Sequence, residues 1–256
     1  MRRPSRAGPS SGSSRLLRNR REERVELWTE TVGSPPPVYG ERWNEKAGRL
    51  YRSFEPGRSK LAAALMNGWS GPLPKAGARW LYLGAASGST ASHVADLVGP
   101  EGRVYAVEKS LRPFARLYQL SNRWPNLLPI LADARMPEEY LDLVPPVDGI
   151  YADIAQPDQV EIVRRNAATF LRAPGDAVVL ALKTASMGRG RSPAAYLAIG
   201  EEGLDPFVEL DRAVRLDPFH RAHFMVGGHA CRALFGAGGS TPTTSRRAPR
   251  PGPRPR

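Results

Sequence analysis

Three short segments of the sequence combine small or acidic residues at spacings that could form a ligand-binding site. Residues 81–90 read Leu-Tyr-Leu-Gly-Ala-Ala-Ser-Gly-Ser-Thr and place Gly84 and Gly88 with three residues between them. Glycines let a backbone turn tightly and approach a ligand closely. The other two segments are residues 103–108 and 127–133, which end on the acidic residues Glu108 and Asp133. Together they offer one close backbone turn and two carboxylates.

The spacing of these residues argues against pyrophosphate cofactors. Gly-x-x-x-Gly is neither the Gly-x-Gly-x-x-Gly of dinucleotide sites nor a P-loop, because no Gly-Lys-Ser/Thr follows. Glu108 can instead accept hydrogen bonds from both hydroxyls of a ribose, and Asp133 can meet an adenine amino group. The set therefore indicates adenosine held without phosphates, and S-adenosylmethionine is the common cofactor of that shape. The structural alternative is a small-residue turn with helix caps at Ser87 and Ser89 and a solvated charge at Glu108.

Alternating strands and helices must position these residues. Strands followed by helical crossovers predict a parallel sheet flanked by helices on both faces, and ligands bind such sheets at the carboxyl ends of the strands. The strands that open the sheet are expected at residues 80–83, 103–108, 127–131, 147–152 and 176–182. A closing antiparallel pair is expected at 207–216 and 223–234. The helices are expected at 87–98, 111–121, 157–171 and 193–200. The predicted fold class is α/β, with a mostly parallel seven-stranded sheet.

The positive charge of the chain is concentrated at its two ends. The formal net charge is +12, and almost all of it lies in residues 1–24 and 240–256. Both segments lack a periodic apolar pattern, so both are predicted to be disordered basic tails. Residues 25–55, with strand pieces expected at 25–29, 38–41 and 50–52, are predicted to form a small N-terminal β domain. Residues 56–239 are predicted to form the main domain, which is nearly neutral. The high net charge therefore does not by itself indicate a basic RNA-binding face on the folded part.

Composition excludes several classes of protein. The longest clean apolar run, at residues 177–182, is far too short to span a membrane. A single cysteine, Cys231, excludes an intrachain disulfide and is typical of a reducing compartment, and no secretory signal opens the chain. No cluster has metal-ligand spacing, and we interpret His93 and His229 as structural or surface residues. We therefore expect neither a metal, nor a membrane, nor secretion.

Four stretches together resemble the fibrillarin family. They are Arg-Ser-Lys-Leu-Ala-Ala-Ala at 58–64, Leu-Tyr-Leu-Gly-Ala-Ala-Ser-Gly-Ser-Thr-Ala-Ser-His at 81–93, Ala-Asp-Ala at 132–134 and Asp-Ile-Ala-Gln-Pro at 153–157. The resemblance covers about residues 38–235. It implies an S-adenosylmethionine-dependent methyltransferase (Rossmann-like) fold with a small N-terminal β domain, so that residues 56–239 would be the methyltransferase domain. It also implies methylation of ribose 2′-hydroxyls in rRNA, and in archaea also in tRNA.

The same resemblance implies which residues contact the cofactor. These lie in the glycine-containing turn, at the ends of the second and third strands, and directly after the fourth. The predicted cofactor-binding residues are Gly84, Ala86, Ser87, Gly88, Ser89, Thr90, Glu108, Lys109, Asp133, Ala134, Asp153, Ile154, Ala155 and Gln156.

The resemblance further implies a catalytic set of Lys60, Asp153, Lys183 and His223. A ribose hydroxyl is a poor nucleophile at neutral pH, so it needs a positioned base or a field that favours the alkoxide. Lys183 and Asp153 each end a predicted strand, so both are expected to face the ligand crevice, where a partly desolvated lysine beside a carboxylate can take part in proton transfer. Lys60 would place positive charge beside the developing oxyanion. His223 would orient the ribose or assist proton removal.

The sequence departs from the family pattern at two places. The family commonly has Tyr-Glu-(Lys/Arg)-Asp-His before the last strand, whereas residues 219–223 read Phe-His-Arg-Ala-His. The spacing to the following Phe-Met-Val-Gly favours His223 over His220 as the catalytic histidine. The aromatic residue usual after Glu108 is replaced by Lys109, which is expected to change the packing on the adenosine.

Family membership would also imply partners and a location. In the family, a box C/D guide RNA, a Nop-type scaffold protein and a kink-turn-binding, ribosomal-protein-like subunit choose the target nucleotide. A nearly neutral folded core fits an enzyme that binds RNA mainly through such partners. The location would be cytoplasmic in an archaeon and nucleolar in a eukaryote.

Four alternative functions stay open at this point. A heat-shock-type ribose methyltransferase uses Lys-Asp-Lys-Glu, and His223 in place of the glutamate argues against it. A non-catalytic RNA-particle subunit would not need Lys60, Asp153 and Lys183 intact. A small-molecule methyltransferase would be expected to carry an added lid domain. A ribose methyltransferase that acts without a guide is the remaining alternative.

Overall fold

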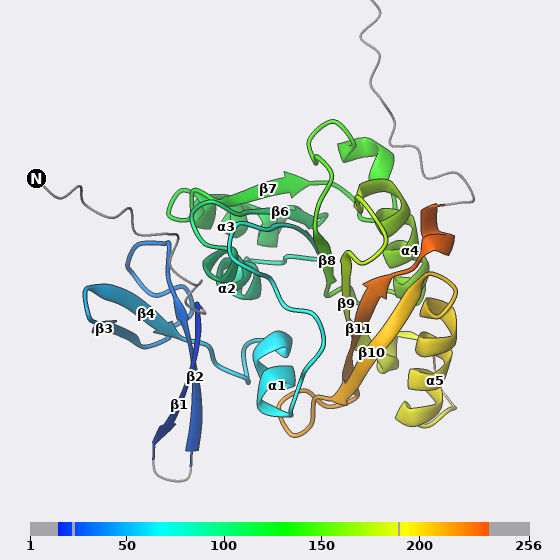
Figure 1. The fold of residues 1–256 in the computed structure, drawn as a ribbon, viewed down its shortest axis with the longest axis horizontal. Helices are drawn as coiled ribbons and strands as arrows, with labels where there is room; N and C mark the ends of the chain where they lie inside the picture. Colours follow the sequence, from blue (N-terminus) through cyan, green and yellow to red (C-terminus); the bar gives the residue numbers. More distant parts are fainter. Residues whose placement is uncertain (1–14, 22–23, 189, 236–256) are drawn as a thin grey trace, which may run out of the picture.

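In the part of the chain that the structure describes, seven strands form the main sheet (Figure 1). The computed structural model describes residues 15–21, 24–188 and 190–235. In spatial order the strands are β10 (Val208–Arg215), β11 (His223–Ala230), β9 (Ala177–Lys183), β8 (Gly149–Ala152), β5 (Arg79–Leu83), β6 (Arg103–Glu108) and β7 (Leu127–Leu131). The five strands from β9 to β7 are parallel, and β11 and β10 are antiparallel. The predicted mostly parallel, seven-stranded α/β fold is therefore confirmed.

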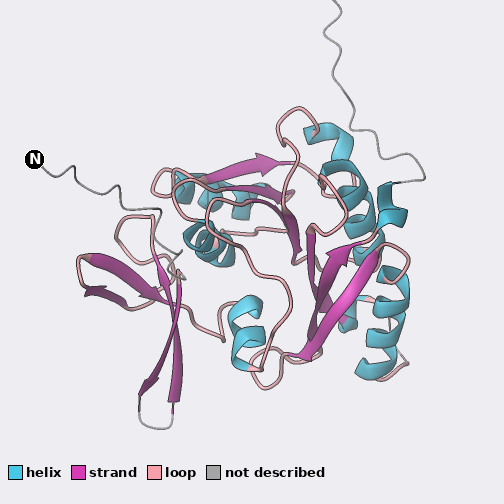
Figure 2. Cartoon of the chain, viewed as in Figure 1, coloured by secondary structure: helices cyan, strands magenta, loops and turns pink. Residues whose placement is uncertain are grey.

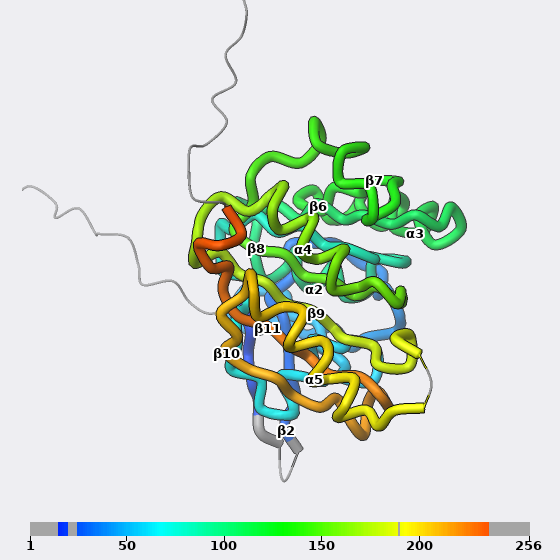
Figure 3. Tube along the Cα trace, turned by 90° about the vertical axis from the view of Figure 1, so that its right-hand side faces the viewer, coloured from blue at the N-terminus to red at the C-terminus, as the bar shows by residue number. Residues whose placement is uncertain are grey.

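Helices cover both faces of this sheet, as Figures 2 and 3 show from two directions. One face packs on α1 (Lys60–Met66), α2 (Ser89–Val98) and α3 (Leu111–Ser121). The other packs on α4 (Gln159–Phe170) and α5 (Pro193–Leu204). Side chains of β5 alternate between the two cores, since Trp80 and Tyr82 join the first and Leu81 and Leu83 the second. Strand periodicity thus builds both cores at once. Short 3-10 turns lie at Pro137–Tyr140, Thr184–Ser186 and Arg232–Phe235.

Most of the expected elements are present, with local differences that have physical causes. Helix α2 begins two residues later than expected because Gly88, at φ +87°, adopts the left-handed conformation and caps it. Strand β11 ends at Ala230, before the 3-10 turn at Arg232–Phe235. Helix α1 was not predicted, because its seven residues are too short to show a helical repeat.

A second, four-stranded antiparallel sheet forms the N-terminal part of the described chain. Its spatial order is β1 (Leu16–Arg21), β2 (Arg24–Glu30), β4 (Arg49–Ser53) and β3 (Trp43–Lys46). The prediction of a disordered tail over residues 1–24 is wrong for β1, because pairing with β2 supplies partners that composition cannot reveal. The small β domain expected at 25–55 therefore begins earlier. Residues 1–14 and 236–256 of the two predicted tails lie outside the described residues.

The expected strand at residues 38–41 is instead a loop. The carboxylate of Glu41 accepts hydrogen bonds from the backbone N–H groups of Val38 and Tyr39 at 2.8–2.9 Å. These bonds satisfy donors that a strand would give to a neighbour, so the loop closes on its own side chain.

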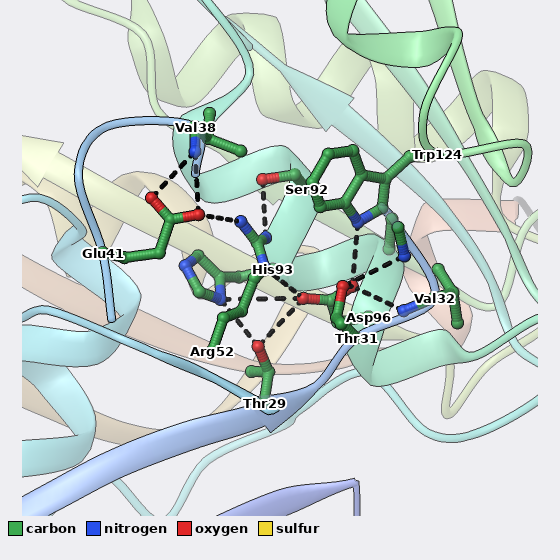
Figure 4. Close-up of polar contacts among 12 residues, drawn as sticks. Thr29, Thr31, Val32, Val38, Glu41, Arg52, Ser92, His93, Asp96 and Trp124 are labelled. Carbon is green, nitrogen blue, oxygen red and sulfur yellow. Dashed lines mark hydrogen bonds and ion pairs between the residues drawn. The ribbon is translucent and has the colours of Figure 1, made fainter. Parts of the chain in front are cut away.

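A buried polar network joins the N-terminal sheet to α2 (Figure 4). The Arg52 guanidinium on β4 donates to Asp96 at 2.6 Å, to Glu41 at 3.1 Å and to Ser92 at 2.7 Å. Asp96 also accepts from Trp124 Nε1, and Thr29 lies 2.8 Å from His93 Nδ1. The side chains of Arg52, Asp96 and Glu41 are fully buried. The network therefore fixes the small sheet on the helix that follows the glycine-containing turn.

The structure places the two remaining histidines as structural or surface residues, as expected. His93 is completely buried, and burial holds its pKa well below the usual value, so its ring is neutral. His229 is half-exposed and pairs with Asp211 at 2.9 Å. No helix in the described parts of the chain is long and apolar enough to cross a membrane. Those same parts contain no group of three or more His, Cys, Asp or Glu residues placed to hold a metal ion.

Candidate active site

A cavity of about 240 Å³ opens at the carboxyl ends of β5, β6, β7 and β8. This is the sheet edge at which ligands bind in open α/β folds. Ten of the fourteen predicted cofactor residues line it, namely Gly84, Ala86, Glu108, Lys109, Asp133, Ala134, Asp153, Ile154, Ala155 and Gln156. The elements therefore bring these ten side chains and backbone turns to one place.

Four predicted residues lie outside the lining of this cavity: Ser87, Gly88, Ser89 and Thr90. Gly88 has a different role, because a Cβ atom there would lie 2.7 Å from Leu120 and 2.8 Å from Leu117. Its missing side chain lets α2 and α3 pack closely. The part that these four residues take in cofactor binding stays a prediction.

Gly84 is required where β5 turns into the cavity. It has φ +77°, and a Cβ atom there would lie only 2.4 Å from the backbone oxygen of Asp153. A side chain would therefore push apart the turns that follow β5 and β8. Because both turns line the cavity, the absence of a side chain at residue 84 sets their spacing.

Glu108 is the buried carboxylate of the cavity, with only 8% of its surface exposed. Its Oε2 atom accepts from Ala86 N at 2.9 Å and its Oε1 atom from Ser110 N at 2.7 Å. A carboxylate offers about four acceptor positions, so positions remain for two ligand hydroxyls. The side chain thus fixes the glycine-containing turn and still presents acceptors to the cavity.

Asp133 and Lys109 also line the cavity. Asp133 Oδ1 accepts from Arg135 N at 3.0 Å, and Lys109 Nζ lies 3.6 Å from Asp133 Oδ2. The Arg135 guanidinium donates to Gln156 at 2.7 Å and to Asp158 at 2.9 Å. Arg135 therefore ties the turn after β7 to the turn after β8. Arg135 could not be identified from the sequence, because one arginine in a turn resembles an ordinary solvated charge.

The donor set fits the nucleoside part of S-adenosylmethionine. The cavity combines apolar walls at Val107, Ala134 and Ile154 with the buried Glu108 carboxylate and the Asp133 carboxylate. Its glycine-containing turn, residues 84–90, has neither the Gly-Lys-Ser/Thr nor the Gly-x-Gly-x-x-Gly spacing of pyrophosphate sites. The chemistry of the residues present therefore agrees with adenosine held without phosphates.

A larger groove, of about 1080 Å³, lies at the opposite edge of the sheet. It is lined by the segment 70–80 and by Asp148, Arg172 and His229. None of the predicted site residues lines it. Volume alone therefore does not locate the site, whereas the carboxylates at the strand ends do.

An ion pair between Lys60 and Asp153 lies at the mouth of the carboxyl edge. Lys60 Nζ donates to Asp153 Oδ1 at 2.7 Å and to Oδ2 at 2.9 Å, and both side chains are about one-fifth exposed. Lys60 opens α1, which is capped by the Ser59 hydroxyl accepting from Ala62 N. The ends of the two strands predict Asp153 beside Lys183, whereas the ion-pair partner of Asp153 is Lys60.

Lys183 ends β9, and His223 begins β11 directly opposite it in the antiparallel register. Within the described residues the Lys183 ammonium has no ion-pair partner at 4.0 Å or less, so its charge stays available to a ligand. Its backbone N–H and C=O both bond to the Gln159 side chain, at 3.0 Å and 3.2 Å. The structure thus brings all four predicted catalytic residues to one edge of the sheet, although their roles stay predictions.

The two histidines near this edge differ in the nitrogen that they leave free. His220 Nε2 lies 2.9 Å from Pro56 O, and His223 Nδ1 lies 2.7 Å from Arg221 O. Carbonyl oxygens only accept, so each of these nitrogens carries a proton. Burial lowers the pKa of His223 below its usual value, against the opposing effect of the Arg221 carbonyl, and the Lys60 ammonium lowers it further. His223 is therefore neutral at pH 7 and keeps a lone pair on Nε2.

Replacing His223 with alanine is expected to slow methyl transfer more than replacing His220. His223 has a neutral ring with a free Nε2 atom, whereas the Nε2 atom of His220 is hydrogen-bonded to the Pro56 carbonyl. Single-turnover rates of both variants against pH would check this. The pKa of His223 is lowered, so wild-type activity should hold at neutral pH and fall only as the pH drops below about 6.5. A larger loss in the His220 variant would assign the catalytic role to the other ring.

Comparison with known proteins places this site in context. The fibrillarin family model matches residues 16–232. A fibrillarin-like rRNA/tRNA 2′-O-methyltransferase of Aeropyrum pernix is 46% identical over 190 residues, which cover 74% of this chain and 81% of that protein.

Two solved structures are also similar. The crystal structure of Aeropyrum pernix fibrillarin, in complex with natively bound S-adenosyl-L-methionine, has a TM-score of 0.71 at 40% identity, covering 82% of this chain and 90% of that one. The fibrillarin of a fibrillarin/Nop5p complex has a TM-score of 0.72 at 38% identity, covering 81% and 94%.

Proposed function

Because this chain belongs to the fibrillarin family, we propose that its Lys60–Asp153 pair, Lys183 and His223 activate a ribose 2′-hydroxyl for methylation. The chain is an S-adenosylmethionine-dependent 2′-O-methyltransferase that acts on ribose in rRNA and tRNA. The observation that carries the assignment of residues is the ion pair beside a cavity that presents a buried glutamate. Reactive groups and cofactor pocket share one sheet edge.

The residues divide the work of the reaction. S-adenosylmethionine supplies an electrophilic methyl group on a sulfonium, and Glu108 and Asp133 would hold its nucleoside part. Asp153, held by Lys60, would accept a hydrogen bond from the 2′-hydroxyl. The unpaired Lys183 ammonium would stabilise the negative charge that develops on the 2′-oxygen. His223 Nε2, which is neutral, would accept the proton or orient the ribose.

We propose that partners select the nucleotide. A Nop-type scaffold binds this chain, and RNA is its substrate. A box C/D guide RNA and a kink-turn-binding protein would complete the particle, in the cytoplasm of an archaeon or the nucleolus of a eukaryote. The near-neutral charge of residues 25–239 supports this proposal, because such a core would gain much of its RNA affinity from partners.

Reconstitution tests the guided reaction directly. The full chain is incubated with cofactor and substrate RNA, alone and with the scaffold, the kink-turn-binding protein and a guide RNA, and the methylated positions are mapped. We expect one guide-specified ribose to be methylated only in the complete mixture. Equal methylation without the guide would favour the guide-independent alternative, and no methylation in any mixture would favour a non-catalytic subunit.

Replacing Glu108 with alanine is expected to weaken cofactor binding by about 2–4 kcal/mol. The variant loses the hydrogen bonds of a charged acceptor to two ribose hydroxyls, and the turn at Ala86 loses its anchor. Calorimetric titration with S-adenosylmethionine measures this loss. Glu108→Gln keeps the shape of the side chain but not its charge, so its cofactor affinity should lie between those of the wild type and Glu108→Ala. Wild-type affinity in Glu108→Ala would remove this residue from the site.

Removing residues 1–14 and 236–256 is expected to weaken binding of free RNA while leaving guided methylation intact. The deletion takes away eight arginines and keeps both sheets. Fewer counterions would be released, so RNA affinity should also depend less on salt. RNA affinity against salt, melting temperature and guided turnover are the measurements. Loss of guided turnover in a folded truncation would place a tail in the substrate site.

A further inference from the structure

Gln159 is completely buried, although its side chain is a polar amide. Its Oε1 atom accepts from Lys183 N at 3.0 Å, and its Nε2 atom donates to Lys183 O at 3.2 Å. We propose that Gln159 is a positioning residue for methyl transfer, which holds the backbone of Lys183 so that its ammonium meets the reacting oxygen. The inference rests on the proposed function, because it assigns to Gln159 a task in the same reaction.

The sheet itself does not satisfy the backbone N–H and C=O of Lys183. On one side, His223 of β11 lies opposite Lys183 in the register, but both backbone groups of Lys183 face the other way and bond to Gln159. On the other side, pairing with β8 ends at Leu180, opposite Ala152. A strand end without its neighbour would present free N–H and C=O groups and could move. The Gln159 amide takes the place of the missing strand, because it donates and accepts on the same residue as a neighbouring backbone would.

Gln159 also joins Lys183 to the segment that carries Asp153. It opens α4, and only five residues separate it from Asp153. That segment is held in turn by Lys60, through its ion pair with Asp153, and by Arg135, through Gln156 and Asp158. One side chain therefore fixes the strand of one predicted catalytic residue against the turn of another.

The amide is needed for its hydrogen bonds and not only for its volume. A leucine of similar size would fill the same space but would leave the N–H and C=O of Lys183 buried without partners. The neighbouring strand end would then be free to shift, and a displacement of about 1 Å at a reacting group can lower a rate about a hundredfold. The cofactor cavity should be spared, because Gln159 does not line it.

The test compares Gln159→Leu and Gln159→Glu with a matched control, Asn126→Leu. Asn126 is another buried amide that bridges two backbone oxygens, those of Ala95 and Gly99, each at 2.8 Å. It precedes β7 and so lies at the opposite edge of the sheet. Each full-length variant is assayed for unfolding, cofactor affinity, single-turnover methylation with partners and RNA, and hydrogen exchange of the Lys183 amide.

We expect Gln159→Leu to slow single-turnover methylation about a hundredfold without changing cofactor affinity, and to speed exchange at Lys183. Asn126→Leu should lower stability but keep the rate. Gln159→Glu should recover activity relative to wild type as the pH falls, because a protonated carboxyl both donates and accepts. A wild-type rate in Gln159→Leu, or a loss entirely in cofactor affinity, overturns the proposal.

The exchange measurement separates this inference from the proposed function. If the wild-type chain methylated no RNA, the proposed function would fail. The exchange of the Lys183 amide would still decide whether Gln159 holds that backbone, since it needs no turnover. Unchanged exchange in both Gln159 variants would overturn the positioning role whatever the activity.

Discussion

Replacing Asp153 with alanine is expected to lower the single-turnover rate of methyl transfer by at least about a hundredfold, the contribution of a positioned acid–base group. Asp153 is the acceptor that Lys60 holds at the cavity mouth, and its backbone oxygen lies against Gly84. The variant removes both the acceptor and the partner that orients Lys60. Lys183→Ala should have a loss of the same size, since it removes an ammonium that no described carboxylate neutralises.

Both variants should stay folded, so a lower single-turnover rate than that of the wild type would reflect the reaction and not unfolding. The Lys60–Asp153 pair is partly exposed, so water can solvate the ammonium that Asp153→Ala leaves behind. Asp153→Asn serves as a conservative control that keeps the shape of the side chain. Circular dichroism and cofactor titration establish folding and binding before rates are compared. Near-normal turnover in either alanine variant would contradict the mechanism.

Replacing Asp96 with alanine is expected to lower the free energy of unfolding by about 3–5 kcal/mol, because the fully buried Arg52 loses one of its two carboxylate partners and keeps only Glu41. Asp96 also accepts hydrogen bonds from Thr29, Thr31 and Trp124, so the variant loses contacts from three segments at once. The small sheet should loosen from α2. Denaturant unfolding measures the loss.

An exposed pair on α4 provides the matched control. Glu161 and Arg164 lie 2.6 Å apart with about half of each side chain exposed, so Glu161→Ala should cost less than about 1 kcal/mol. Equal losses at the two sites would show that burial does not set the strength of the Asp96 network. Hydrogen exchange should also rise across β2 and β4 in Asp96→Ala alone.

Strand and helix patterns predicted the main sheet well, because each of its central strands is buried on both faces and is therefore a nearly continuous apolar run. The strand Arg103–Glu108, the helix Leu111–Ser121 and the strand Leu127–Leu131 have the expected bounds. The N-terminal sheet was predicted less well. Its strand β1 is rich in arginine and lies beside a partner in β2, and local composition carries no record of that pairing.

The residues of the candidate site also fall into two groups, those that local sequence could place and those that depend on distant contacts. Glu108 and Asp133 could be placed from sequence, because an acid that ends a strand must lie at the carboxyl edge of the sheet. Arg135 and Gln159 could not, since each acts through a contact with a segment that is distant in the sequence. The sequence also could not show that Asp153 pairs with Lys60 rather than with Lys183, because this pairing depends on where α1 packs. That position follows from tertiary contacts and not from any local pattern.

The chemical position of the transferred methyl group tests the central claim most directly. Wild-type protein, with the scaffold, the kink-turn-binding protein, a guide RNA and S-adenosylmethionine labelled in its methyl group, is incubated with substrate RNA, and the RNA is then digested to nucleosides. We predict that all the label is found in one 2′-O-methylnucleoside, that the adjacent phosphodiester resists alkali, and that Asp153→Ala abolishes both signals. Label on a base, or label on ribose that is undiminished in Asp153→Ala, would contradict the assignment of this sheet edge to ribose methylation.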